Sequence, residues 1–227
     1  MLEPSEELDS SCLLGLSMLV QDLGGKGKPF ILLCCGKEYA DVSASLASVL
    51  SPASRVLTIN FDSLTALNWG EFGRQLDTGL TDNRVRQANF IAFGASAVLV
   101  QDLALRNAKI VRSAVFVDGH TRPPSGFVER ALSALEQRLP LGLPFRIRRK
   151  EFDGKPFLQR LRFPILLLNT VRANQYQIEQ SRMMSELIPT SFLEIVSGRT
   201  AENQAKEIEV LLQEFQSVPA KCPQKAA

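Results

Sequence analysis

The sequence has a single histidine, His120, and this scarcity limits the chemistry open to the chain. A reaction that requires a histidine base must use this residue. Long apolar runs are also lacking, because the longest extend for about seven to nine residues, whereas a membrane-spanning helix needs roughly 20. The first residues, Met-Leu-Glu-Pro-Ser-Glu-Glu, are acidic where a signal peptide would be basic. We therefore predict a cytoplasmic protein with no membrane partner.

The four cysteines follow neither the spacing of a disulfide framework nor that of a zinc site. Cys34 and Cys35 are adjacent in an apolar run, and neighbours in a strand point to opposite faces, which hinders their pairing. A large excess of one charge is missing as well, since 26 basic and 24 acidic residues leave a formal net charge of +2. This balance gives no electrostatic reason to expect nucleic acid as a partner. The sequence predicts no metal and no cofactor.

The chain of 227 residues is long enough for one domain with a buried core, and we predict a single domain over residues 1–227. Strand-like and helix-like stretches alternate, which favours an α/β fold with a mostly parallel central sheet and flanking helices. The predicted strands cover residues 30–35, 56–61, 90–93, 110–118, 163–169 and 192–196, after a loosely alternating stretch at 14–22. Helices are predicted at 40–50, between 62 and 86, at 97–105 and from 201 onward.

The interval 121–162 is too long for an ordinary connection between two core strands. It contains several prolines and helical material near 127–139. We interpret it as a small lid over the carboxyl ends of the strands. Its basic residues, among them Arg146 and Arg148, are typical of a face exposed to solvent. The alternative is that they attract an anionic ligand or an acidic partner.

The segment Gly94-Ala95-Ser96-Ala97-Val98 joins a short buried strand to a predicted helix. With the order of elements, it resembles the α/β-hydrolase superfamily, in which a serine within Gly-x-Ser-x-Gly lies on a sharp strand-to-helix turn. The resemblance covers residues 14–216 and implies that Ser96 occupies the strained centre of the turn. It also implies an oxyanion hole from the amides of Ala97 and Lys37, beside Cys35-Gly36. Val98 replaces the last glycine of the pattern.

The partners of a catalytic serine are not at their usual places in this sequence. The resemblance puts an acid near Ala173 and a histidine near Thr200. We predict that Thr200 instead caps the last helix. Asp118 and His120 lie at the end of the strand at 110–118 and form an alternative acid and base. Their simpler interpretation is a loop aspartate and a partly exposed histidine at the root of the lid.

Two functions follow, and a third remains open. The first is a non-catalytic protein that keeps the fold and binds a small molecule or a protein partner at the former active-site pocket. The second is a serine hydrolase of the esterase or thioesterase kind, with a rearranged site formed by Ser96, His120 and Asp118. The third is a purely structural or assembly role in which side chains fill the pocket. The sequence predicts no particular oligomeric state.

Overall fold

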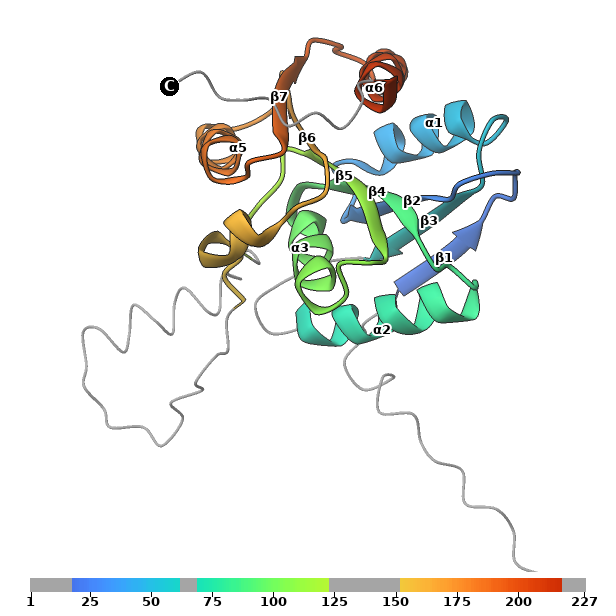
Figure 1. The fold of residues 1–227 in the computed structure, drawn as a ribbon. Helices are drawn as coiled ribbons and strands as arrows, with labels where there is room; N and C mark the ends of the chain where they lie inside the picture. Colours follow the sequence, from blue (N-terminus) through green and yellow to red (C-terminus); the bar gives the residue numbers. More distant parts are fainter. Residues whose placement is uncertain (1–17, 62–68, 123–151, 218–227) are drawn as a thin grey trace, which may run out of the picture.

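The computed structural model describes residues 18–61, 69–122 and 152–217, and these form a seven-stranded sheet with helices on both faces (Figure 1). The strands are β1 (Met18–Asp22), β2 (Phe30–Cys35), β3 (Val56–Phe61), β4 (Ala88–Phe93), β5 (Val111–Val117), β6 (Ile165–Thr170) and β7 (Ser191–Val196). The helices are α1 (Ala40–Leu50), α2 (Trp69–Asp82), α3 (Ala97–Arg106), α5 (Gln175–Leu187) and α6 (Ala201–Ser217), with short 3-10 helices η2 (Gly94–Ser96) and η3 (Lys155–Arg160).

The strand order is β1-β3-β2-β4-β5-β6-β7, and only β1 runs antiparallel to its neighbour. The predicted α/β class with a mostly parallel sheet is therefore confirmed. Strand β4 explains why the sequence signal was clear: all six of its residues are buried, as expected of a central parallel strand covered on both faces.

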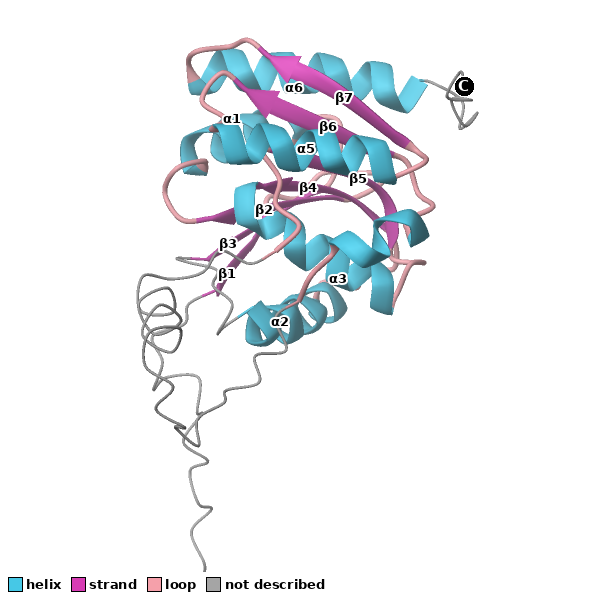
Figure 2. Cartoon of the chain, turned by 90° about the vertical axis from the view of Figure 1, so that its left-hand side faces the viewer, coloured by secondary structure: helices cyan, strands magenta, loops and turns pink. Residues whose placement is uncertain are grey.

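Two apolar layers hold the helices to the sheet. Helices α2, α3 and α5 cover one face (Figure 2), where Phe72, Leu99 and Phe90 belong to one buried cluster. Helices α1 and α6 cover the other face and pack against each other, with Leu46 and Ile208 in the same cluster. Along β2, side chains alternate between these two layers, because successive residues of a strand point to opposite faces.

The predicted lid leaves the sheet after β5, and its residues 123–151 lie outside the described part of the chain. The two described ends of the insertion meet. The Gly154 amide donates a hydrogen bond of 2.9 Å to the Thr121 carbonyl, and Arg122 forms an ion pair with Asp153. The insertion therefore starts and finishes at one point beside the carboxyl ends of the strands.

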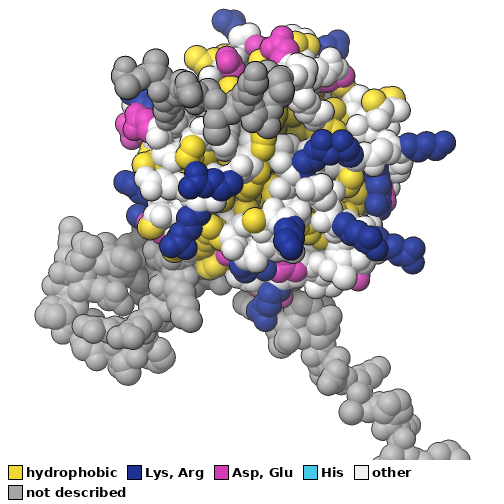
Figure 3. All heavy atoms as spheres, viewed as in Figure 1, with side chains coloured by type: hydrophobic (Ala, Val, Ile, Leu, Met, Phe, Trp, Pro, Cys, Tyr) yellow, Lys and Arg dark blue, Asp and Glu magenta, His cyan; other side chains and the backbone are white. Residues whose placement is uncertain are grey.

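Basic side chains do not gather into one surface on the face drawn in Figure 3. There the Lys and Arg side chains stand apart from one another among neutral atoms. A continuous basic strip is the usual footprint for nucleic acid, and this face does not present one. None of the helices in the described part of the chain is long and apolar enough to cross a membrane.

Candidate active site at the carboxyl edge of the sheet

The turn after β4 is sharp, but its centre is not the residue that the sequence pattern predicts. Gly94 has the positive φ of the turn, 56°, whereas Ser96 has the helical values φ −65° and ψ −17°. In α/β-hydrolases the nucleophile occupies the strained position of this turn. The strained position in this chain is therefore Gly94. Ser96 lies two residues later, at the position that the last glycine of the Gly-x-Ser-x-Gly pattern would occupy.

The hydroxyl of Ser96 points into the protein. The residue is 0% exposed, and Oγ lies 2.8 Å from the carbonyl oxygen of Leu33 and 2.7 Å from that of Phe93. Its proton can be donated to either carbonyl, so the hydroxyl ties the turn after β4 to strand β2. In this arrangement Ser96 supports the turn and offers no exposed oxygen.

The ring of Tyr39 occupies the space beside the turn. A Cβ atom at Gly94 would lie 3.1 Å from Tyr39 Cε2, and the rings of Tyr39 and Phe93 have centroids 5.8 Å apart. The Tyr39 hydroxyl donates to Asp118 Oδ2 at 3.1 Å and accepts from Gln177 Nε2 at 3.1 Å. Tyr39 thus links the turn to β5 and α5.

Asp118 is fully buried at the end of β5, with a φ of 51° that is unusual for a residue with a side chain. Its carboxylate accepts hydrogen bonds from the Thr170 amide at 2.8 Å, the Thr170 hydroxyl at 2.7 Å and Tyr39. Burial raises the pKa of Asp118, against the lowering effect of these donors. The carboxylate is engaged by this network, and among the described residues it makes no hydrogen bond to His120 or Ser96.

His120 lies next to the turn through its backbone. Its amide donates to the Gly94 carbonyl at 3.3 Å, and its ring meets the edge of Tyr176 with centroids 5.5 Å apart. The ring nitrogen Nε2 is buried and has no hydrogen-bond partner in the described structure. Burial lowers the pKa of His120, so the imidazole is neutral near pH 7. The structure brings His120 close to the turn without joining it to Ser96 or Asp118.

The amides predicted for an oxyanion hole are already engaged in part. The Ala97 amide donates to the Gly94 carbonyl within the first helical turn, and the Gly36 amide donates to the Phe61 carbonyl at 2.8 Å. Cys35 is half-buried at the end of β2, and Lys37 is exposed in the loop that follows. With the turn centred on Gly94, the amide that follows the central residue belongs to Ala95 rather than to Ala97.

The loop after β7, where the superfamily has its histidine, is closed against α6. Thr200 Oγ1 accepts from the Asn203 amide at 3.3 Å, which confirms its predicted role as helix cap. Glu207 accepts from the amides of Ser197 and Gly198 at 3.0 and 2.8 Å, and these bonds lower the pKa of its carboxyl. Ala173 donates its amide to the Thr170 carbonyl in a tight turn after β6.

Sequence reasoning missed the three polar residues that complete this site: Tyr39, Thr170 and Gln177. The one local signal was Asn174, which caps α5 together with Gln177 in a capping box. That signal predicts a helix start and says nothing of Tyr39, which is 138 positions away from Gln177. Within the described ranges, no three His, Cys, Asp or Glu side chains lie together in a way that could hold a metal ion.

Replacement of Tyr39 by Phe should destabilise the protein by about 1–3 kcal/mol, because Asp118 and Gln177 each lose a buried partner. Chemical denaturation followed by circular dichroism measures the difference. Tyr176→Phe is the matched control, since Tyr176 is 47% exposed, and it should change stability by less than about 0.5 kcal/mol. Equal stability of Tyr39→Phe and the wild type would contradict the assigned network.

His120 should make the protein less stable as the pH falls from 7.5 through 6.5. Burial holds the pKa of the folded histidine below its ordinary value of 6.5, so the unfolded chain binds the proton more readily in this range. The loss is at most about 1.4 kcal/mol per pH unit. Asp118 acts with the opposite sign, because its raised pKa favours proton uptake by the folded state.

The comparison of wild type with His120→Gln over pH 5.5–7.5 isolates the histidine, since Asp118 is common to both proteins and the chain has no other histidine. Denaturation midpoints of the variant should fall less on acidification. Parallel curves for the two proteins would show that His120 is not buried in its neutral form.

Comparison of the sequence with protein-family models gives no match, and comparison with curated protein sequences gives none. Solved structures give many matches. An esterase from a Rhodococcus species superimposes with a TM-score of 0.67 at 17% identity, over 90% of this chain and 96% of that one. An enol-lactonase from Burkholderia xenovorans gives 0.64 at 17% identity, over 90% and 98%. MenH from S. aureus gives 0.61 at 14% identity, over 87% and 99%.

At these identities the similarity establishes the fold and not the activity. It spans nearly the whole length of each neighbour. The chain has the α/β-hydrolase fold.

Proposed function

We propose that this chain is a non-catalytic protein with an α/β-hydrolase fold, which binds a small molecule or a protein partner at the carboxyl edge of its sheet without hydrolysing it. The observation that supports this proposal is the residue at the centre of the sharp turn. Gly94 has no side chain to act as a nucleophile, and the hydroxyl of Ser96 faces two carbonyl oxygens inside the protein.

The energetic cost of recruiting Ser96 also supports the proposal. To reach a substrate, the hydroxyl would have to leave the Leu33 and Phe93 carbonyls, and a lost buried hydrogen bond costs about 1–3 kcal/mol. Without a hydrogen-bonded base, the serine also loses the factor of about 10²–10⁴ that general-base assistance supplies. Both losses act on the same step, so together they disfavour hydrolysis through Ser96.

The same edge retains exposed groups that suit recognition. Val171 follows β6 and is 53% exposed, and Tyr176 stands half-exposed in the first turn of α5 beside the ring of His120. Together with the paired ends of the insertion at Thr121 and Gly154, they border the edge on the side of α5. We propose that the insertion 121–162 covers this surface, and that an ester or lactone, as acted on by the esterase and the enol-lactonase of similar fold, is the first ligand class to try.

The alternative is a serine hydrolase of the esterase or thioesterase kind that uses Ser96, His120 and Asp118. One observation favours it: His120 is held neutral by burial and has a ring nitrogen without a partner next to the turn. It requires a rearrangement that frees Ser96 from its carbonyls and Asp118 from Tyr39 and Thr170. The cytoplasmic location and the single domain over 1–227 also stay predictions.

The proposal predicts that a fluorophosphonate does not label Ser96. Intact-mass measurement after incubation should show unmodified protein, and turnover of short p-nitrophenyl esters should equal that of the Ser96→Ala variant. An active serine esterase treated in parallel controls for reagent quality. Labelling that disappears in both Ser96→Ala and His120→Gln would overturn the proposal and support the rearranged hydrolase.

A further inference from the structure

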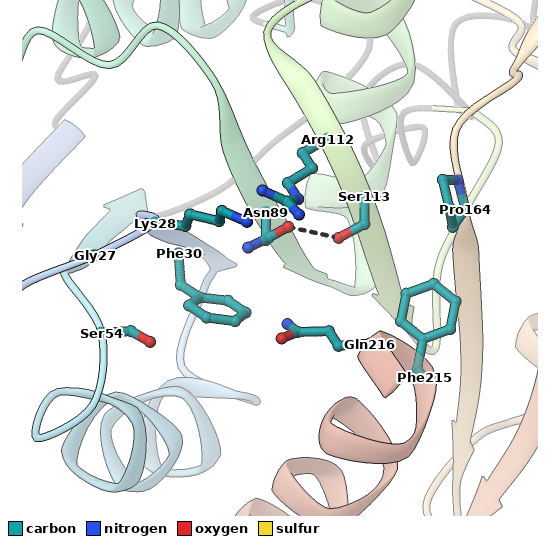
Figure 4. A pocket seen from close by; sticks show the side chains of 10 residues that line it. All are labelled: Gly27, Lys28, Phe30, Ser54, Asn89, Arg112, Ser113, Pro164, Phe215 and Gln216. Atoms are coloured by element: carbon teal, nitrogen blue, oxygen red, sulfur yellow. Dashed lines mark hydrogen bonds between the residues drawn. The ribbon is translucent and has the colours of Figure 1, made fainter. Parts of the chain in front are cut away.

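A concave site lies at the amino edge of the sheet, opposite the turn after β4. A pocket of about 850 Å³ opens there, within the size range of small-molecule sites. It lies between the first residues of four strands and the last turn of α6 (Figure 4). The lining residues are Gly27, Lys28, Phe30, Ser54, Asn89, Arg112, Ser113, Pro164, Phe215 and Gln216.

A β-bulge explains why this pocket is polar and basic. In the pairing of β4 with β5, Ala88 lies opposite Val111 but Asn89 lies opposite Ser113, so Arg112 is the extra residue. A bulge redirects side chains at the position where it interrupts the pleat. Val111 and Ala114 both pack in the layer beneath α2 and α3, although regular alternation would put them on opposite faces. The bulge therefore lets the consecutive residues Arg112 and Ser113 both line the pocket.

The polar groups at the base of the pocket are donors. Ser113 Oγ donates to Asn89 Oδ1 at 2.8 Å, and both residues are largely buried. This bond engages the amide oxygen of Asn89, while its NH₂ group faces the ends of Lys28 and Arg112 in Figure 4. The side-chain nitrogens of Lys28, Arg112 and Asn89 thus face one region of the pocket.

The ten residues that line the pocket carry a positive charge. Lys28 and Arg112 are exposed, and neither forms an ion pair within the described residues. The ten lining residues include no acid. The carboxyl end of α6 contributes a partial negative charge of about one half, which is smaller than the two full positive charges. An anion is therefore the complementary group.

Apolar side chains form the remaining walls. Phe30 lies below Asn89, and Phe215 and Pro164 stand on the opposite side. Aromatic rings supply contact area for a flat or aliphatic group. We propose that this pocket is a binding site for a small organic anion, a carboxylate or phosphate attached to an aromatic or aliphatic body, held by Lys28, Arg112 and Asn89. The site does not depend on the function of the carboxyl edge.

Isothermal titration calorimetry with 2-naphthoate tests whether the positive charge of the pocket contributes to binding. Titration with its neutral analogue 2-naphthylmethanol tests the contribution of the apolar walls. The full chain should bind 2-naphthoate with a Kd of about 1 mM or tighter. Arg112→Gln and Lys28→Gln should each weaken 2-naphthoate by about three- to tenfold, while binding of the neutral analogue stays within about twofold. Arg112→Lys should fall between Arg112→Gln and the wild type, because it keeps the charge and loses the planar fork.

Two further variants locate the ligand. Lys109→Gln removes an exposed charge that does not line the pocket, and it should leave the 2-naphthoate Kd unchanged. Gln216→Trp fills the pocket from its exposed rim on α6 and should weaken both compounds.

Nuclear magnetic resonance should show 2-naphthoate perturbing the side-chain amide of Asn89 and the backbone of Ser113. Absence of saturable binding at about 10 mM would overturn the proposal. So would an equal loss of affinity in Lys109→Gln and Arg112→Gln, or perturbations centred on His120 instead of Asn89.

Discussion

The contact of Tyr39 with Gly94 is the constraint on which the carboxyl edge of the sheet depends. A positive φ is accessible to glycine at little cost, and the missing side chain leaves room for an aromatic ring. Tyr39 uses that room and carries its hydroxyl to Asp118. One side chain thereby fixes the loop after β2 against the turn after β4 and the end of β5. A Cβ atom at position 94 would require the Tyr39 ring to shift, so the glycine at this position and the ring beside it go together.

The buried carboxylate of Asp118 shows how this choice is stabilised. Desolvation of a carboxylate costs several kcal/mol, and the three hydrogen bonds from Thr170 and Tyr39 offset part of it. The raised pKa means that desolvation still outweighs the donors. Each of the three hydrogen bonds matters here, because the loss of one donor leaves more of the desolvation cost of the buried carboxylate without compensation. Asp118 therefore specifies how β5, β6 and the Tyr39 loop fit together.

The sequence predicted elements better than it predicted contacts. The apolar run at 30–35 and the strand at 90–93 follow from local patterns, and Thr200 was recognised as a helix cap from its position before an amphipathic helix. The residue with the positive φ was misplaced by two positions, because a Gly-x-Ser pattern identifies a turn and does not state which of its residues has the positive φ. The Tyr39–Asp118 bond joins residues 79 positions apart, and the bulge at Arg112 arises from the pairing of two strands. Neither has a local signature.

Strand β4 connects the two edges of the sheet. Gly94 follows its last residue and Asn89 is its second, so the turn and the amino-edge pocket are separated by five residues, about 17 Å of extended chain. Ligands at the two edges would therefore not compete for space. Every residue of β4 between them is buried, and the strand pairs in parallel with β2 and β5. A packed core resists small continuous distortions, and coupling between distant sites needs an element with two discrete arrangements. We therefore expect ligands at the two edges to bind independently of each other.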